Sequence, residues 1–212
     1  MSKVLIVGNG ILNSNKFYIN LSKKVDFIIG VDIGAKVLLD AGVKPDLAIG
    51  DFDSFENFGL FEKAGIRIIK YPIEKDKSDT ELAIDFAVEN EFTGFLFSSM
   101  LGRRIDHALF NISLLLKLCK EGKNCAIVEE NEEIYPISSE SRIFKVNTVD
   151  IVSIFPLDKI VYGVLTEGLK YELQNKDLFY GSTLPLSNVA LKNEISISIK
   201  KGTALVIIEK IK

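Results

Sequence analysis

The sequence predicts an α/β protein, in which an N-terminal, mostly parallel, Rossmann-like α/β domain is followed by a C-terminal antiparallel β-sandwich domain. Up to residue 129, short continuous apolar runs alternate with segments of helical periodicity, which is typical of parallel strands buried on both faces. Beyond it, several runs alternate apolar and polar side chains and no long helical pattern occurs, which favours antiparallel strands. We therefore predict domains at residues 1–130 and 131–212.

In the first domain, repeated strand–helix–strand units predict a parallel sheet with right-handed crossovers. The predicted strands are residues 4–7, 27–30, 47–49, 66–70, 94–97 and 125–128. The predicted helices are residues 35–41, 55–64, 80–88 and 106–120. Three of these helices are followed closely by a glycine, a common helix stop, and the helix at 80–88 begins after Ser78 and Asp79, whose side-chain oxygens can cap free N–H groups.

The second domain is predicted to consist of strands alone. The candidates are residues 133–137, 142–146, 150–155, 160–166, 190–199 and 204–210. Residues 194–200 alternate most regularly, with isoleucine on one face and polar side chains on the other.

The composition argues against several functional classes. The 212 residues include 26 basic and 29 acidic side chains, a net charge of −3, and no dense run of lysine or arginine, so we expect no nucleic-acid partner. No apolar run approaches the roughly 18 residues that a membrane span needs, so we expect no membrane association. Two cysteines supply neither a disulfide framework nor a cysteine zinc cluster, and a reducing cytoplasm is the simplest location.

Two acidic residues follow the predicted strand at 47–49 directly. These are Asp51 and Asp53, and Asp79 lies at a predicted helix start after the next strand. Ligands of open α/β sheets bind at the carboxyl ends of the strands, and Mg²⁺ prefers carboxylate oxygens together with substrate phosphates. The three acids therefore indicate a magnesium site. The alternative is that they are ordinary loop and capping residues.

A basic segment, Gly102-Arg103-Arg104-Ile105-Asp106-His107, opens the helix at 106–120. Arginine donors at a helix N-terminus form a ready phosphate site. His107 is the chain's one histidine, and taken alone it is more often structural than catalytic. The chain has no Walker-type phosphate loop, and Gly8-Asn9-Gly10 is as consistent with a plain turn as with a phosphate loop.

Five segments together match a known family. They are Val31-Asp32-Ile33-Gly34-Ala35, Lys44-Pro45-Asp46 through Gly50-Asp51-Phe52-Asp53-Ser54, Lys75-Asp76-Lys77-Ser78-Asp79, Gly102 through His107 with Asn111, and Gly168-Leu169-Lys170-Tyr171 with Leu186-Ser187-Asn188. In this order they resemble the thiamine pyrophosphokinase (thiamin diphosphokinase) family. The resemblance spans nearly the whole chain and implies an α/β nucleotide domain followed by a β-sandwich.

The resemblance implies an enzyme that transfers pyrophosphate from ATP to the hydroxyl of thiamine, giving thiamine diphosphate and AMP, in a homodimer. It implies Mg²⁺ bound by Asp51, Asp53 and Asp79, and active-site roles for Arg104 and Asp106. Contacts to ATP or its phosphates would come from Asp32, Lys75, Ser78, Arg104 and His107, and contacts to thiamine from Ser187 and Asn188. If a general base is needed, Asp106 or Asp79 is the candidate.

The chain departs from the family pattern in a few places. Arg103 stands at a usual glycine position, Ile33 takes the place of a glycine, Ser78 that of the commoner threonine, and Tyr171 that of a tryptophan. The acids and Arg104 remain, so the phosphate chemistry is better supported than the choice of acceptor. Two alternatives stay open: a diphosphokinase acting on another heterocyclic alcohol, such as a hydroxymethylpterin, and a non-catalytic module that senses nucleotide or thiamine.

Overall fold

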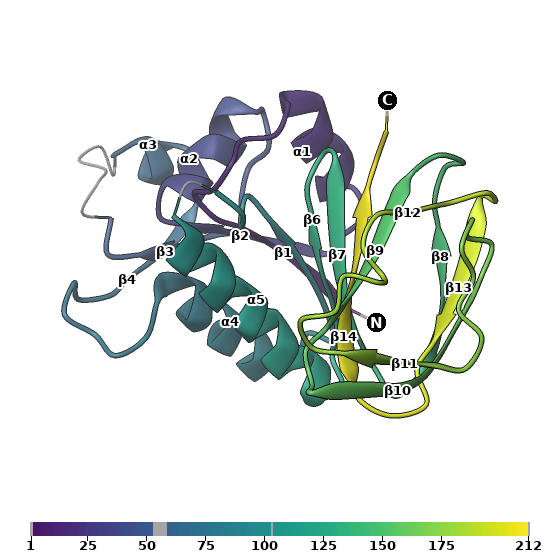
Figure 1. The fold of residues 1–212 in the computed structure, drawn as a ribbon. Coiled ribbons are helices and arrows are strands. Elements are labelled where there is room, and N and C mark those ends of the chain that lie inside the picture. The colour runs from purple at the N-terminus through teal and green to yellow at the C-terminus, as the bar shows by residue number, and fades with distance from the viewer. Residues whose placement is uncertain (1, 53–58, 103, 212) are drawn as a thin grey trace. The chain divides into compact units, whose positions relative to one another are not determined.

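The computed structural model describes residues 2–52, 59–102 and 104–211. The chain forms two compact units, Met1–Glu130 and Asn131–Lys212 (Figure 1). Within the described residues, no helix is both long enough and apolar enough to cross a membrane.

The first unit contains a parallel sheet whose strands are largely buried. The strands are β1 (Lys3–Val7), β2 (Phe27–Val31), β3 (Leu47–Gly50), β4 (Arg67–Lys70), β5 (Gly94–Ser98) and β6 (Asn124–Val128). Their order is β6-β5-β1-β2-β3-β4, and each neighbouring pair in this order is parallel. The order reverses between β1 and β5, as in doubly wound α/β folds. The predicted strands and their parallel arrangement are confirmed.

Helices cover both faces of this sheet. They are α1 (Asn15–Ser22), α2 (Ile33–Asp40), α3 (Gly59–Lys63), α4 (Asp79–Glu89) and α5 (Ile105–Lys120). Figure 1 shows α1 and α2 on one face and α4 and α5 on the other. Helix α1 was not predicted, although Ser14 caps it by accepting a hydrogen bond from Phe17 N. Of the predicted helix at 55–64, residues 55–58 lie outside the described residues.

Two loops meet at the reversal of strand order. After β1, Gly10 N donates to Ser99 O at 2.6 Å, and Ile11 N donates to Leu101 O at 2.6 Å. A Cβ at Gly10 would lie 2.6 Å from Ser99 O, so only glycine permits this close approach of two backbones. This structural role explains Gly10 of the Gly8-Asn9-Gly10 segment without a bound phosphate.

The second unit is built from two antiparallel sheets. Its strands are β7 (Glu132–Ser138), β8 (Ser141–Lys145), β9 (Ile151–Pro156), β10 (Ile160–Glu167), β11 (Lys176–Phe179), β12 (Asn188–Val189), β13 (Glu194–Ser198) and β14 (Thr203–Glu209). The sheet orders are β12-β9-β14-β7 and β11-β10-β13-β8. Ile154 and Val206 from one sheet and Val161 and Ile197 from the other belong to one buried apolar cluster, so the sheets pack face to face as a sandwich.

The second unit differs from prediction in three details, of which the first is the two-residue strand β12, which was not predicted. The single strand expected at 190–199 is divided: Ala190 forms an isolated bridge with Leu169, and β13 begins only at Glu194. The short strand β11 was not predicted, because Lys176–Phe179 has one buried residue among exposed ones and lacks an apolar run.

Candidate active site

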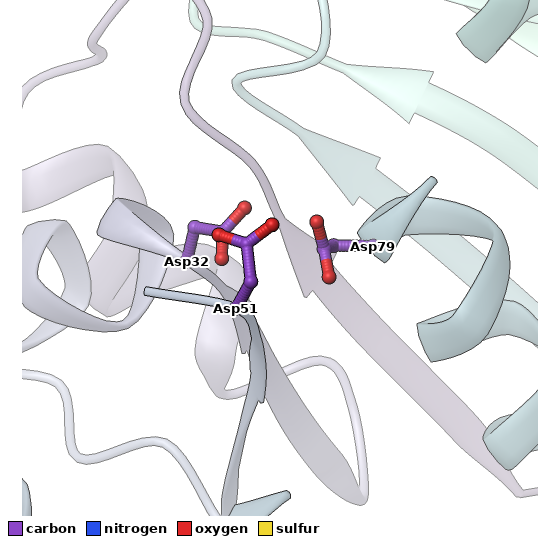
Figure 2. A group of neighbouring side chains, drawn as sticks. All are labelled: Asp32, Asp51 and Asp79. Atoms are coloured by element: carbon purple, nitrogen blue, oxygen red, sulfur yellow. The ribbon is translucent and has the colours of Figure 1, made fainter. Parts of the chain in front are cut away.

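Three carboxylates come together at the carboxyl end of the parallel sheet. Asp32 follows β2 and precedes α2, Asp51 follows β3, and Asp79 is the first residue of α4. One oxygen from each lies within 4.8 Å of the others. Figure 2 shows Asp79 pointing from the helix start toward Asp32 and Asp51. We call Asp32, Asp51 and Asp79 the acidic triad.

The register of the sheet brings Asp32 to Asp51. Strands β2 and β3 pair with Val31 opposite Ile49, and Asp32 N donates to Ile49 O at 2.9 Å. Asp32 therefore stands beside Gly50. A Cβ at Gly50 would overlap the Asp32 carboxylate, so glycine makes room for that side chain. The Asp32 carboxylate also accepts a long hydrogen bond of 3.4 Å from Phe52 N.

Asp32 has an unusual backbone conformation. It precedes α2 with φ 48° and ψ −119°, and its side chain makes no capping hydrogen bond to that helix. A non-glycine residue in such a region is strained by roughly 1–3 kcal/mol, and such strain is found disproportionately at functional sites. Its carboxylate lies near those of Asp51 and Asp79 and does not cap the helix.

Lys75 forms ion pairs with two acids of this site. Its Nζ lies 2.8 Å from Asp51 Oδ2 and 3.1 Å from Asp79 Oδ1, and it donates to Pro72 O at 3.1 Å. All three charged side chains are only 14% exposed. Asp79 Oδ1 is buried and has no aligned hydrogen-bond partner among the described residues, so its contact with Lys75 is an ion pair without hydrogen-bond geometry.

The charges and the burial of the site shift the pKa values of its side chains. Burial, followed by the charge of Asp79, raises the pKa of Asp32 to about 7, and the charge of Asp51 adds to this effect. Burial opposes the charged form of Lys75, but its close contacts with the carboxylates of Asp51 and Asp79 and their negative charges outweigh this effect, so the pKa of Lys75 is raised above its usual value. Among the residues that the structure describes, three acids face one ammonium group, which leaves room for a further cation.

The oxygens of the acidic triad fit a hard divalent metal ion. Mg²⁺ prefers carboxylate oxygens, and a buried carboxylate oxygen without an aligned donor, such as Asp79 Oδ1, is the kind of ligand that such an ion completes. The sequence prediction placed Asp51, Asp53 and Asp79 on the metal. The structure brings Asp51 and Asp79 together with Asp32. Asp53 and Ser54 lie outside the described residues.

Ser78 has a structural role in the site. It caps α4 by accepting a hydrogen bond from Glu81 N at 3.2 Å. A cap of this kind stabilises a helix by about 1 kcal/mol. Ser78 thereby fixes the helix start from which Asp79 reaches the acidic triad.

Two of the residues predicted to contact phosphate, Arg104 and His107, lie at the start of α5. Arg104 Nε donates to Asp106 Oδ1 at 3.0 Å, and a second Arg104 nitrogen bonds Asp106 Oδ2. The Arg104 side chain is 69% exposed and that of Asp106 is 52% exposed. The Arg104 hydrogen bond lowers the pKa of Asp106 to about 2. His107 follows on the same helical turn, and Arg103 lies outside the described residues.

Glu129 is a site-supporting residue that sequence reasoning missed. It follows β6 and is 8% exposed. Its Oε2 accepts from Ser99 N at 2.9 Å, Asn13 Nδ2 at 2.6 Å and Ser98 Oγ at 3.2 Å, and its Oε1 accepts from Met100 N at 3.0 Å. These bonds fix the backbone of Ser99 and Met100 directly after β5. The available signal was an acid directly after a buried strand, as at Asp51.

Comparison with known proteins identifies the family. The protein-family model for the thiamin pyrophosphokinase catalytic domain matches residues 18–128. The protein-family model for the thiamin pyrophosphokinase vitamin B1 binding domain matches residues 140–204. This chain belongs to the thiamine pyrophosphokinase family. The family expected from the sequence motifs is thereby confirmed.

Individual thiamine pyrophosphokinases are similar along nearly the whole chain. The thiamine pyrophosphokinase of Bacillus subtilis (strain 168) is 34% identical over 182 residues, which are 84% of this chain and 85% of that protein. A crystal structure of thiamine pyrophosphokinase from B. subtilis has a TM-score of 0.88 at 28% identity, covering 100% of both chains. That from Geobacillus thermodenitrificans has a TM-score of 0.84 at 28% identity, covering 99% of this chain and 98% of the other.

The residues expected to contact thiamine in this family member lie in the second unit. Ser187 has a positive φ of 56°, and its N–H donates to Ser153 Oγ at 2.9 Å. The Asn188 side chain pairs with the Tyr171 backbone in both directions, accepting from Tyr171 N at 3.1 Å and donating to Tyr171 O at 2.7 Å. Asn188 therefore holds the segment around Tyr171, whose side chain is 65% exposed.

Proposed function

We propose that this chain catalyses the transfer of pyrophosphate from ATP to the hydroxyl of thiamine, giving thiamine diphosphate and AMP. The observation that carries the proposal is the match of both halves of the chain to thiamin pyrophosphokinase domains. The acidic triad, at the carboxyl end of a parallel sheet where ligands of such folds bind, supports it. A hydroxymethylpterin acceptor is not favoured, because the second match is to a vitamin B1 binding domain.

Asp32, Asp51 and Asp79 would hold Mg²⁺, and Asp53 stays a predicted further ligand. When bound, the metal neutralises negative charge on the ATP phosphates. The contribution of the three aspartates is to fix its position at the carboxyl ends of β2 and β3 and at the start of α4.

The other polar residues of the first unit would orient the phosphates. Lys75 lies within the acidic triad, and Arg104 stands at a helix N-terminus with its guanidinium exposed. Phosphoryl-type transfer depends mainly on positioning and charge stabilisation, and positioning can supply about 7–11 kcal/mol. Asp106 has a pKa of about 2 and would be a weak general base, so its role would be to orient Arg104. His107 would be a secondary contact.

The second unit would bind thiamine, the acceptor of the pyrophosphate. The vitamin B1 binding domain match covers residues 140–204, which include Ser187 and Asn188. The two residues would contact thiamine or shape the segment that does. A homodimer, a cytoplasmic location and the absence of nucleic-acid and membrane partners remain predictions from the sequence.

The experiment that tests this function is mass spectrometry of the products formed from ATP, Mg²⁺ and thiamine by the purified chain. Thiamine diphosphate and AMP in equal amounts are expected. A panel of pterin and other heterocyclic alcohols serves as the specificity control. A product with a pterin alcohol and none with thiamine would contradict the proposed acceptor. Thiamine binding without AMP formation would instead identify a sensing module.

A further inference from the structure

Lys75 occupies the oxygens that a metal ion would need. Its Nζ is surrounded by Asp51 Oδ2 at 2.8 Å, Asp79 Oδ1 at 3.1 Å and Pro72 O at 3.1 Å. Two of these three oxygens belong to the acidic triad. The ammonium group donates hydrogen bonds to Asp51 Oδ2 and Pro72 O and forms an ion pair with Asp79 Oδ1.

Charge compensation explains why Lys75 lies there. The acidic triad places three carboxylate oxygens within 4.8 Å of one another, and the ion-paired side chains are 14% exposed, so water screens their mutual repulsion poorly. The positive charge of Lys75 offsets that repulsion in the absence of metal. Two cations cannot hold the same oxygen pair without repelling each other at short distance.

The position and chemistry of Lys75 allow its side chain to move away from Asp51 and Asp79. It lies between β4 and α4, outside both elements, and a lysine side chain is a flexible stem that carries a point charge. A nucleotide phosphate offers the ammonium group an alternative anionic partner. Movement of Nζ onto the phosphate would remove the ammonium group from Asp51 Oδ2 and Asp79 Oδ1.

We propose that Lys75 is a resident counter-cation that competes with Mg²⁺ for Asp51 and Asp79 and is drawn off by the nucleotide phosphates. Metal binds weakly when nucleotide is absent, and metal and nucleotide each strengthen the binding of the other. The inference rests on the proposed function, because it takes the acidic triad as a magnesium site.

The test measures binding of Mn²⁺, a paramagnetic substitute for Mg²⁺, by the loss of the free Mn²⁺ signal in electron paramagnetic resonance. Lys75→Met in the full chain, without nucleotide, is expected to bind Mn²⁺ about tenfold or more tightly than the wild type, because the competing cation is gone. The matched control is Lys77→Met. Lys77 lies on the same segment between β4 and α4 and pairs with Asp85 at 2.6 Å. Lys77→Met therefore removes one positive charge, as Lys75→Met does, without changing a contact of the acidic triad.

A second measurement adds ATP with a methylene group between the α and β phosphorus atoms, which the proposed transfer cannot cleave. In the wild type this nucleotide is expected to tighten Mn²⁺ binding, and in Lys75→Met the gain is expected to be smaller. Lys75→Gln, which keeps a polar side chain of similar length, repeats both measurements in case Lys75→Met folds poorly.

Equal or weaker Mn²⁺ binding in both Lys75 variants would overturn the proposal, as would an equal tightening in Lys77→Met. Failure of the proposed function is a separate result, because it is read from the products of ATP and thiamine and leaves Mn²⁺ binding measurable.

Discussion

The carboxylate of Asp32 lies against the backbone of Gly50, in the space that any side chain at position 50 would fill. Asp32 directly follows β2 and Gly50 ends β3, so the contact is set by the register of these two parallel strands. Gly50 is therefore part of the acidic site although it carries no functional group.

Gly50→Ala is expected to displace the Asp32 carboxylate from the acidic triad. A misplacement of about 1 Å in a catalytic group can lower the rate roughly a hundredfold, and a loss of this order is expected in AMP release from ATP and thiamine. Mn²⁺ binding should weaken in parallel. The matched control is Gly94→Ala at the other end of the parallel sheet, where a Cβ would meet the side chain of exposed Lys3 first. Equal losses in both variants would contradict the role given to Gly50.

The pKa of Asp32, raised to about 7, makes the stability of the metal-free protein depend on pH. Between the ordinary pKa of 3.8 and about 7, folded Asp32 binds a proton that the unfolded chain has released. This stabilising contribution is complete below the unfolded pKa and is lost as the pH rises through about 7. In EDTA, the unfolding temperature should therefore fall between about pH 6 and about pH 8.

Asp32→Asn removes this contribution, so its unfolding temperature should change less with pH over the same interval. Asp85→Asn, which leaves the acidic triad intact, should keep the wild-type slope. An unchanged slope in Asp32→Asn would show that Asp32 titrates near its ordinary value.

Loss of a metal-binding carboxylate should reduce activity more than loss of the histidine. Asp51→Asn is expected to lower turnover roughly a hundredfold or more, since about 2.7 kcal/mol of transition-state stabilisation corresponds to that factor. His107→Ala should cause a smaller loss. Coupled AMP release measures both, with Asp85→Asn as the control for an acid outside the site. Near-normal turnover of a well-folded Asp51→Asn protein would rule out the metal assignment.

Glu129→Gln is expected to destabilise the first unit by about 2–4 kcal/mol. Glu129 Oε1 accepts from Met100 N, and Glu129 Oε2 accepts from Ser99 N. In either orientation, the NH₂ group of a glutamine side chain would face one of these two N–H donors. Urea unfolding measures the change. Glu130→Gln is the matched control: Glu130 bonds Ser14 in a more exposed setting, and a loss below about 1 kcal/mol is expected. Equal losses would contradict the special role of Glu129.

Much of the fold could be predicted because buried parallel strands leave continuous apolar runs in the sequence. Helix α1 was missed because its eight residues carry a weak apolar pattern, with only Tyr18 and Leu21 buried. The division of the strand at 190–199 was missed because alternation of side chains does not reveal where the backbone leaves the sheet.

Part of the site could be predicted because the positions of the strands also indicate which residues follow them at the edge of the sheet. Asp51 and Asp79 were found from their positions after strands. Asp32 entered only through family resemblance, because its proximity to Asp51 depends on the pairing of β2 with β3, which local sequence does not encode. Glu129 was missed because the acids around it were interpreted as a domain boundary, and its hydrogen-bond partners Asn13 and Met100 lie far away in the sequence.

The positive φ of Asp32 has a consequence for engineering. Glycine adopts φ near 48° without strain, so Asp32→Gly would relieve both the backbone and the crowding of like charge around the acidic triad. Selection of variants for heat resistance alone would therefore favour the removal of a group that the proposed reaction needs. Thermostabilising libraries of this protein should hold position 32 fixed and seek their gains elsewhere in the chain.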